Sequence, residues 1–402
     1  MKGKLVAVII SAFAFSSCYM VRAYKYRNLE LSDVHSMPSV TIEKGDSARS
    51  FINKSRQQLY DEMGRRLDSM LSDTYTAAFV IIRNDTMIYE SYFNGFDQSS
   101  LLPSFSVAKS IVGTLIGIAI HDGAMSPADP VTKYLPSLSR NDARFEKITI
   151  QNLLDMRSGI DFNEGSYDLK DDAIKLGFRP NIQKQVKKLK VKKAPGGELN
   201  YQSINTLLLA MALEKATGKS VHTYLSEKIW KPAGMEFDAS WTVDSKKHQQ
   251  EIAYAGVNAA ARDYAKFGSL YLNDGKANGK QIIPSEWIKA TVDADTMRKY
   301  DGYKNQLWGV SRYINFSDSL KARAYVNMHK NTGGVRSYTN KEGKKAFYVP
   351  YQSSEFYAQG ILGEFVYVHP EKNLVIVRLG HFWKHKTISD PLSFIKLLAD
   401  EM

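Results

Sequence analysis

The sequence predicts an α+β protein, in which an antiparallel sheet is flanked by helices and interrupted by a mostly helical insertion. Two β-rich runs, Ala77 to Ile82 and Met87 to Tyr92, are joined by a short turn, which indicates a hairpin. Helical patterns fill the middle of the chain, and strand patterns return at Gly363 to Val368 and Leu374 to Leu379. Strands at both ends with helices between them are typical of one sheet that an insertion divides.

The expected boundaries follow from this order of elements. We expect the sheet part to comprise 51–135 and 295–402, and the helical insertion to span 136–294. Val107 to Ile120 lacks a polar face, which predicts a buried helix. The other expected helices are 149–156, 205–216, 259–272, 284–292 and the terminal 390–402.

The N-terminus predicts export to the cell envelope. A short positive segment precedes an 11-residue apolar run, Leu5 to Phe15, which is too short to span a membrane and is typical of a signal peptide. Cys18 follows two small residues and resembles the acylated first residue of a bacterial lipoprotein. We therefore expect a signal peptide over 1–17 and a membrane anchor at Cys18, with a plain signal peptide and a coincidental cysteine as the alternative. Residues 18–50 are expected to form a tether with little structure.

Composition and charge narrow the class of protein. The chain has 402 residues with ordinary globular composition, a net charge of +12 and one cysteine, so an intramolecular disulfide is excluded. The densest basic cluster lacks interleaved aromatic residues, and no groove-reading motif is present, which argues against nucleic acid as a partner. We expect this cluster to be a solvated surface; the alternative is contact with anionic envelope polymers or headgroups. Its members are Lys184, Lys187, Lys188, Lys190, Lys192 and Lys193.

The pattern Ser-x-x-Lys occurs twice. One copy, Ser393 to Lys396, lies in the expected terminal helix, and the other, Ser106 to Lys109, begins the expected buried helix. Residues three apart share a helix face, so a lysine there can reach the serine hydroxyl. Burial and the positive end of the helix dipole disfavour a charged lysine, and a neutral amine can accept the serine proton. The alternative is a helix-capping serine beside a lysine that extends to solvent.

A tyrosine in a polar loop is a second candidate. Tyr201 follows the turn Pro195-Gly196-Gly197 and precedes an expected helix. A loop phenol can face a cleft, and beside a lysine it can act as a base and an acid. Taken alone, Tyr201 is better interpreted as one ordinary half-buried tyrosine among 23.

In combination, these segments resemble the β-lactamase-related serine hydrolases. The resemblance rests on Ser106-x-x-Lys109, the segment Ile148 to Ile160, Pro195-Gly196-Gly197 and Tyr201-x-Ser203, in this order. The run from Tyr201 to Thr206 is most similar to the 6-aminohexanoate-dimer hydrolase branch, where serine replaces the asparagine of β-lactamases. The resemblance extends from about Ala77 to the C-terminus and implies a β-lactamase/transpeptidase-like fold.

The resemblance implies a role for each matched residue. Ser106 would be the acylated nucleophile, Lys109 its activator and Tyr201 the proton relay to the leaving group and from the deacylating water. Ser203 would orient Lys109 or the substrate. The backbone N–H of Ser106 would donate to the oxyanion. Neither a cofactor nor a metal ion is expected.

The second oxyanion donor would come from a third motif, normally Lys-Thr-Gly. The stretch Lys330-Asn331-Thr332-Gly333 contains these letters with the wrong spacing. We prefer Gly360-Ile361-Leu362-Gly363, which resembles the Gly-x-x-Gly of the dimer-hydrolase branch, with the N–H of Ile361 or of Leu362 as the donor. Without the lysine and threonine that grip a β-lactam carboxylate, we expect poor β-lactamase activity.

Three hypotheses for function remain. The leading one is an envelope serine hydrolase that cleaves small ester, amide or peptide bonds through an acyl-enzyme. The second is a penicillin-binding D-Ala peptidase acting on cell-wall stem peptides, and the third is a catalytically silent binding protein on the same fold. Specificity is expected from the loops 161–178 and 308–325, whose aromatic residues suggest a partly apolar pocket. These aromatic residues are Phe162, Tyr167, Trp308 and Tyr313. The sequence does not predict the oligomeric state.

Overall fold

A computed structural model defines the fold. It describes residues 19–26, 30–46, 48–54, 58–166, 168, 170–329, 332–340 and 342–402. The expected signal peptide, 1–17, and the expected lipidation site, Cys18, lie outside the described residues.

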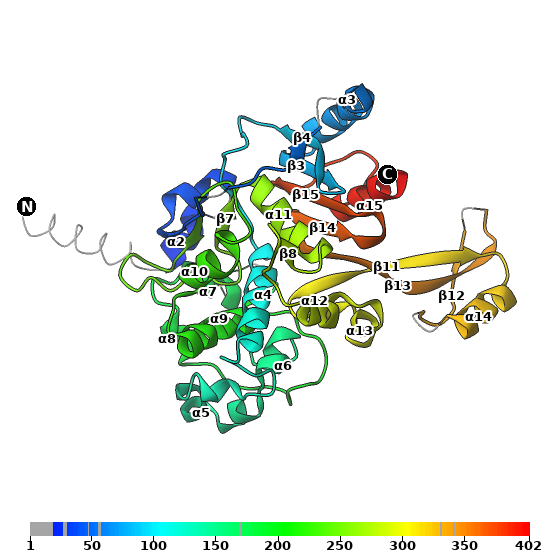
Figure 1. The fold of residues 1–402 in the computed structure, drawn as a ribbon. Helices are drawn as coiled ribbons and strands as arrows, with labels where there is room; N and C mark the ends of the chain where they lie inside the picture. The colour runs from blue at the N-terminus through cyan, green and yellow to red at the C-terminus, as the bar shows by residue number, and fades with distance from the viewer. Residues whose placement is uncertain are drawn as a thin grey trace, which may run out of the picture.

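A nine-stranded sheet forms one side of the molecule (Figure 1). Its order is β10-β11-β13-β14-β15-β3-β4-β2, with β12 beside β13, and every pair is antiparallel except β2–β4. The strands are β2 Ile52–Asn53, β3 Thr76–Arg83, β4 Thr86–Tyr92, β10 Tyr303–Lys304, β11 Leu307–Phe316, β12 Arg336–Thr339, β13 Lys345–Gln359, β14 Phe365–His369 and β15 Leu374–Gly380. Because β15 pairs with β3, the two ends of the chain share one sheet, as the sequence predicts.

Two smaller sheets complete the β-structure. The first has the order β1-β6-β7-β5, and the second is the hairpin β8–β9. Their strands are β1 Ser39–Ile42, β5 Leu102–Pro103, β6 Ala239–Thr242, β7 Val257–Ala259, β8 Lys276–Ala277 and β9 Lys280–Gln281.

The helices lie mainly between β5 and β10. The α-helices are α2 Tyr19–Lys25, α3 Gln58–Ser72, α4 Val107–His121, α5 Ser137–Asn141, α6 Ile150–Leu154, α7 Asp172–Phe178, α8 Gln183–Val186, α9 Ser203–Thr217, α10 Val221–Leu225, α11 Ala261–Leu272, α12 Ser285–Val292, α13 Ala294–Lys299, α14 Ser319–Met328 and α15 Pro391–Glu401. The short 3-10 and π turns are η1 Leu31–Ser36, η2 Val131–Lys133, η3 Ala143–Lys147, η4 Ser226–Trp230 and η5 Pro370–Lys372.

Helix α4 occupies the centre of the main core. Its residues from Val107 to Ala119 are all buried, as its lack of a polar face predicts. Gly117 is required by close packing, because a Cβ there would come within 2.2 Å of the Trp287 ring in α12. Helix α11 covers the sheet, packing on β3, β14 and β15, although its sequence lies within the range expected for the insertion. The expected start of this helix at residue 259 is also two residues early, since Ala259 ends β7.

Two expectations about the fold are wrong. The described residues within 18–50 contain regular structure, whereas a tether with little structure was expected: β1 pairs with β6 along four residues, and Ile42 is completely buried. The segment 308–325 is not a loop but comprises most of β11 and the first part of α14. Strands β11 and β13 extend as a long arm away from the body of the molecule, with β12 and α14 at its end (Figure 1).

Of the helices within the described part of the chain, none combines the length and the apolar character that a membrane span requires.

Candidate active site

Ser106 and Lys109 meet at the start of α4. The Lys109 ammonium donates to Ser106 Oγ at 2.8 Å and to the carbonyl oxygen of Tyr254 at 3.1 Å. Ser106 is the N-cap residue of α4, yet its side chain makes no helix-capping hydrogen bond. Lys109 is 1% exposed, so it does not extend to solvent. Both observations contradict the alternative of a capping serine beside a solvent-exposed lysine.

The surroundings of Lys109 weaken its hold on a proton. Burial lowers the pKa of Lys109 to about 8, and the nearby Glu164 carboxylate acts in the opposite direction. The ammonium also lies 5.0 Å from the centre of the Tyr201 ring and 5.5 Å from that of Tyr254. A lysine with a pKa near 8 is partly neutral at physiological pH and can therefore act as a base.

Tyr201 lies in an aromatic cluster beside Lys109. Its ring stacks on Trp308 with the centroids 5.6 Å apart and meets Tyr303 edge to face at 5.8 Å. Tyr303 is fully buried, and burial raises the pKa of its phenol well above the ordinary value. These contacts fix the orientation of the Tyr201 ring, since aromatic pairs of this kind prefer defined geometries. Trp308 therefore stands at the site, whereas Tyr313 is 64% exposed on the arm.

Ser203 is held by a carboxylate that the sequence analysis did not identify. Glu164 accepts from the Ser203 hydroxyl at 2.7 Å and from the Ser203 backbone N–H at 2.6 Å. Its charge also raises the pKa of Tyr254, in addition to the larger effect of burial. Glu164 lies in a loop with no motif around it, so only the folded structure brings it next to Ser203.

The backbone before the nucleophile candidate is strained. Phe105 has φ +42°, a left-handed conformation that a phenylalanine rarely adopts. Such outliers occur preferentially where surrounding structure enforces a functional geometry. The backbone N–H of Ser106 has no hydrogen-bond acceptor among the described residues, while the next three N–H groups bond within the turn.

The loop 360–363 lies beside this turn. A Cβ at Gly360 would come within 2.7 Å of the Ser104 carbonyl oxygen, which places the loop against the residue two positions before Ser106. The N–H of Leu362 donates to the Glu364 carboxylate at 3.1 Å. The N–H of Ile361 has no acceptor in the described part of the chain. Of the two expected donors, the group that remains available is therefore the Ile361 N–H.

The buried carboxyl of Glu364 and the buried guanidinium of Arg378 hold this loop in place. Glu364 and Arg378 are both completely buried. Arg378 donates to the carbonyl oxygens of Gly363 at 2.6 Å and of Leu362 at 3.3 Å, and three further acceptors fix its other end. Burial raises the pKa of Glu364 to about 8, partly offset by Arg378. A carboxyl that is mostly neutral avoids the cost of a buried, incompletely paired charge.

The structure thus brings together the residues expected at the site. The other segments that contain parts of the same motifs lie elsewhere. Ser106, Lys109, Tyr201 and Ser203 form one cluster, and the loop 360–362 adjoins it. The second Ser-x-x-Lys copy has a structural role: Ser393 bonds to the helix cap Asp390, and Lys396 donates to the carbonyl of Ser311. In the stretch 330–333, residues 330 and 331 lie outside the described residues. Thr332 and Gly333 lie against β13 on the arm.

Comparison with known proteins gives several relatives. The chain is 30% identical over 236 residues to a 6-aminohexanoate-dimer hydrolase from Paenarthrobacter ureafaciens, covering 56% of this chain and 59% of that protein. It is 24% identical to a D-alanyl-D-alanine-carboxypeptidase/endopeptidase AmpH from Escherichia coli, covering 55% of this chain and 60% of that protein. The match thus spans about three fifths of the length of each.

Solved structures match over more of the chain. A protein assigned as a 6-aminohexanoate-dimer hydrolase from Bacillus anthracis superposes with a TM-score of 0.68 at 25% identity, covering 91% of this chain and 90% of that one. A class C β-lactamase in complex with cefoxitin has a TM-score of 0.51 at 16% identity, with 85% and 97% coverage, and shares the fold. The family model described as beta-lactamase matches residues 67–384. Because this match spans most of the chain, the protein belongs to the beta-lactamase family.

Proposed function

We propose that the protein hydrolyses small ester, amide or peptide bonds through an acyl-enzyme formed on Ser106. The observation that carries the proposal is the 2.8 Å contact between Ser106 Oγ and Lys109 Nζ, since this lysine is buried and has a lowered pKa. Neutral Lys109 takes the hydroxyl proton as Ser106 Oγ attacks the substrate carbonyl carbon. The N–H groups of Ser106 and Ile361 stabilise the oxyanion that forms.

Tyr201 is proposed to complete the cycle. When the tetrahedral intermediate collapses, its phenol protonates the leaving alcohol or amine and is left as a phenolate beside protonated Lys109. A water molecule then attacks the acyl-enzyme as the Tyr201 phenolate takes its proton, and Ser106 Oγ leaves and takes back the proton that Lys109 holds. This assignment is supported by the position of Lys109 Nζ 5.0 Å from the Tyr201 ring centre.

A fluorophosphonate probe tests the nucleophile. The wild-type protein should be labelled and Ser106→Ala should not. Ser393→Ala is the matched control, because it removes the serine of the other Ser-x-x-Lys copy and should leave labelling unchanged. Equal labelling of the wild type and Ser106→Ala would refute the assignment.

We propose that the preferred acyl groups are neutral or positively charged. When Lys109 is neutral and ready to act, the Glu164 carboxylate still contributes a negative charge, since it bonds to Ser203 and acts on Lys109. A negative charge in a partly buried site repels a carboxylate substrate. The D-Ala peptidase alternative, which the Escherichia coli relative named above favours, requires a substrate ending in a carboxylate.

Three p-nitrophenyl esters whose acyl groups have equal chain length but different charge test this preference: butyrate, 4-aminobutyrate and hydrogen succinate. The first two should be hydrolysed with the higher kcat/KM, and Glu164→Gln should reduce the difference from the succinate. Labelling by a fluorescent penicillin and hydrolysis of nitrocefin should both be weak. Preference for the succinate would overturn the proposed charge preference. Strong penicillin labelling together with release of D-Ala from a peptide ending in D-Ala-D-Ala would instead establish the peptidase.

We further propose that the mature protein is anchored to the bacterial envelope through acylated Cys18. The support is the sequence before and at this residue, a positive start, an apolar run of 11 residues and two small residues. Several acyl chains on one cysteine anchor a protein far more firmly than one. Metabolic labelling with a radioactive fatty acid should mark the wild type, and Cys18→Ala should be unlabelled and released from membranes. A wild type without label would contradict the anchor.

A further inference from the structure

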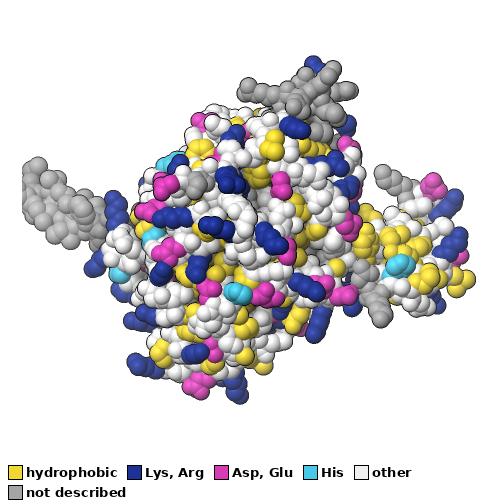
Figure 2. Space-filling model, viewed as in Figure 1, with side chains coloured by type: hydrophobic (Ala, Val, Ile, Leu, Met, Phe, Trp, Pro, Cys, Tyr) yellow, Lys and Arg dark blue, Asp and Glu magenta, His cyan; other side chains and the backbone are white. Residues whose placement is uncertain are grey.

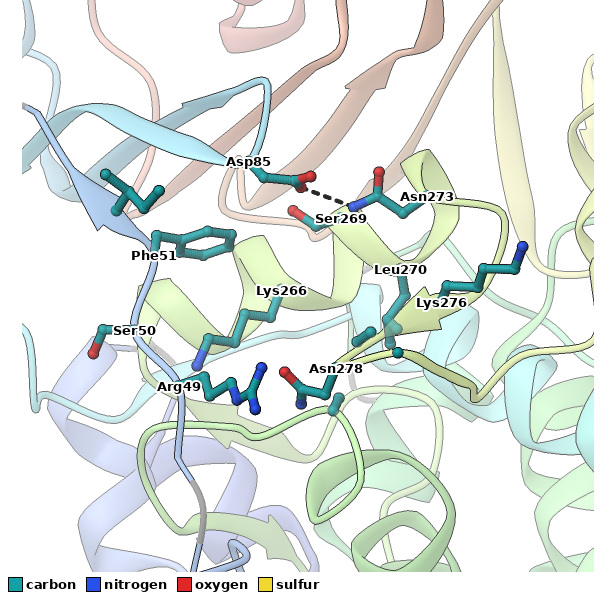
Figure 3. Close-up of a pocket in the computed structure, with 14 residues that line it drawn as sticks. Arg49, Ser50, Phe51, Asp85, Lys266, Ser269, Leu270, Asn273, Lys276 and Asn278 are labelled. Atoms are coloured by element: carbon teal, nitrogen blue, oxygen red, sulfur yellow. Dashed lines mark hydrogen bonds between the residues drawn. The ribbon is translucent and has the colours of Figure 1, made fainter.

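A cavity of about 570 Å³ lies apart from the Ser106 cluster (Figure 3). Its wall combines the segment 49–52, one face of α11, the hairpin β8–β9 and the turn before β4. None of the residues assigned above to nucleophile, proton relay or oxyanion loop lines it. Its volume is within the range of small-molecule sites.

The face of α11 that lines this cavity is polar but poorly solvated. Lys266, Ser269 and Asn273 follow one another at spacings of three and four, so they share one side of the helix. The opposite side carries Gly268, whose Cβ position would lie within 2.9 Å of side chains of β14 and β15. Lys266 and Ser269 are only 7% and 6% exposed, although polar residues facing away from a sheet are usually exposed.

Two cationic side chains and one amide side chain of the cavity wall face one region of the cavity. Figure 3 shows the Arg49 guanidinium, the Lys266 ammonium and the Asn278 amide directed toward the same part of the cavity. No ion pair is formed by Arg49 with the described residues. Lys266 donates to the Gly234 carbonyl at 2.7 Å and lies 3.3 Å from Glu236, and an ammonium has three N–H donors.

Lys266 already has an acidic partner in Glu236, whereas Arg49 has none among the described residues. The acidic residue lining the cavity is Asp85, and its carboxylate already accepts from the Asn273 amide at 2.8 Å. The hydroxyl of Ser269 is buried without a hydrogen-bond partner among the described residues. An unpaired buried hydroxyl costs free energy unless something bonds to it, so the cavity is incomplete without a ligand.

The rest of the wall is apolar. Phe51, Leu270 and Ala277 line it, next to the polar cluster. A bare inorganic anion would leave these groups in contact with water, whereas an organic anion would cover them. The segment that carries Phe51 is tied to the body, because the N–H of Arg49 donates to the carbonyl of Gly234 at 3.2 Å.

We propose that this cavity is a second binding site, specific for a small organic anion with a short apolar chain. Its carboxylate or phosphate head bonds to Arg49, Lys266 and Asn278, and its chain lies along Phe51 and Leu270. The site is distinct from the one that hydrolyses the substrate.

Calorimetric titration of the full-length Ser106→Ala protein tests the proposal, because this variant removes the proposed nucleophile and leaves the cavity intact. Hexanoate is the probe, with hexylammonium and inorganic phosphate as comparisons. Hexanoate should bind, hexylammonium should not, and phosphate should bind more weakly because it cannot cover the apolar wall. Binding of hexylammonium as tight as that of hexanoate, or no binding of hexanoate, would overturn the proposal. Phosphate binding as tight as that of hexanoate would overturn the apolar part of it.

Variants locate the binding. Arg49→Ala should weaken hexanoate binding about tenfold or more, as expected for loss of a charge-assisted hydrogen bond. Lys280→Ala is the matched control, because Lys280 is an exposed cation in β9 that does not line the cavity, and it should bind as the parent does. Equal loss in both variants would indicate general charge attraction, and no loss in Arg49→Ala would place the ligand elsewhere; either result rejects the site.

Discussion

Lys109 illustrates how one residue can combine a structural cost with a chemical use. It is buried in the first turn of α4, where a charged ammonium has lost most of its hydration. The compensation comes from the Tyr254 carbonyl, the Ser106 hydroxyl and the Glu164 charge. These contacts offset only part of the cost of burial, so the pKa of Lys109 stays lowered. The lowered pKa is useful, because the lysine must give up its own proton before it can take one from Ser106.

The pH dependence of hydrolysis should follow from this pKa. Lys109 has a pKa of about 8, below its ordinary value of 10.5, and must be neutral to act as a base. The rate should therefore be low at acidic pH and should rise through an apparent pKa near 8 in a profile of kcat/KM for p-nitrophenyl butyrate. A rate independent of pH between 6 and about 9 would contradict this role.

Glu164→Gln provides a second test of the same group. The carboxylate raises the pKa of Lys109, so its removal should lower that pKa. The rise of kcat/KM with pH should then occur at a more acidic pH. Glutamine can accept from the Ser203 backbone N–H and donate to the Ser203 hydroxyl oxygen, so both contacts can be kept. A shift toward alkaline pH would show that Glu164 acts in some other way.

Tyr201→Phe should keep the fold and lower turnover. Phenylalanine preserves the ring that packs on Trp308 and Tyr303 and removes the group proposed to transfer the proton. A fall in kcat of about 10²–10⁴-fold is expected. Circular dichroism and thermal unfolding control for folding, and an unchanged kcat would exclude the proton-relay role.

The residues that could be predicted are those linked by local geometry. The contact between Ser106 and Lys109 follows from their spacing on one helix, and the turn before Tyr201 marks a loop. Glu164 could not be predicted, because its contact with Ser203 joins residues 39 positions apart and no local pattern accompanies it. The role of Tyr254 could not be predicted either, because its contact with Lys109 uses a backbone carbonyl, which every residue has.

At the scale of elements, the proposed chemistry depends on the shape of the turn between β13 and β14. Glu364 takes the N–H of Leu362, and Arg378 takes two carbonyl oxygens of the same turn. These bonds leave the N–H of Ile361 without a partner among the described residues and hold it near the start of α4. The resulting geometry is fixed before the substrate arrives, as oxyanion stabilisation requires.

Gly360→Ala should lower kcat with little change in KM. The added Cβ would come within 2.4 Å of the Glu364 carboxylate and 2.7 Å of the Ser104 carbonyl, so the turn must shift. A shift of this size displaces the Ile361 donor, and loss of one such donor costs about 10²–10³-fold in kcat.

Gly334→Ala is the control for this variant, because the Cβ added there meets nothing within 4 Å. Steady-state kinetics of both variants decides the outcome. Normal kcat in Gly360→Ala would remove the turn from the mechanism.

The elements differ in how readily the sequence predicts them. The hairpin β3–β4, the helices α4 and α9 and the strands β14 and β15 appear within a few residues of their expected bounds, since each has a strong apolar pattern. The arm strand β11 was missed because its outer half alternates between exposed and half-buried residues. Such a pattern is also typical of a surface loop, and only the pairing with β13 distinguishes the two.

At the scale of the whole molecule, residues near the N-terminus are part of the core. Strand β1 pairs with β6, about 200 positions later, and Ile42 joins the main apolar cluster. No local pattern can reveal a pairing of this separation. A chain lacking this strand would expose the edge of β6 and the cavity that Ile42 fills.

Ile42→Ala should therefore destabilise the protein by about 2–5 kcal/mol, the cost of a cavity in a packed core. Thr41→Ala, in the same strand but exposed, should change the free energy of unfolding by less than about 0.5 kcal/mol. Urea denaturation measures both. Equal, negligible effects would mean that the strand contributes nothing to stability.

The pairing of β3 with β15 has a further consequence for biosynthesis. Residue 80 lies opposite residue 377, so the central sheet has a gap until almost the whole polypeptide has been made. The turn at 360–363 lies against Ser104 and is held by Arg378 of β15, one of the last strands to be translated. A nascent chain on the ribosome therefore carries a β3 that is paired with β4 but open on its other edge. Loss of even its final thirty residues would remove Arg378 and with it the support of the turn that carries the proposed oxyanion donor.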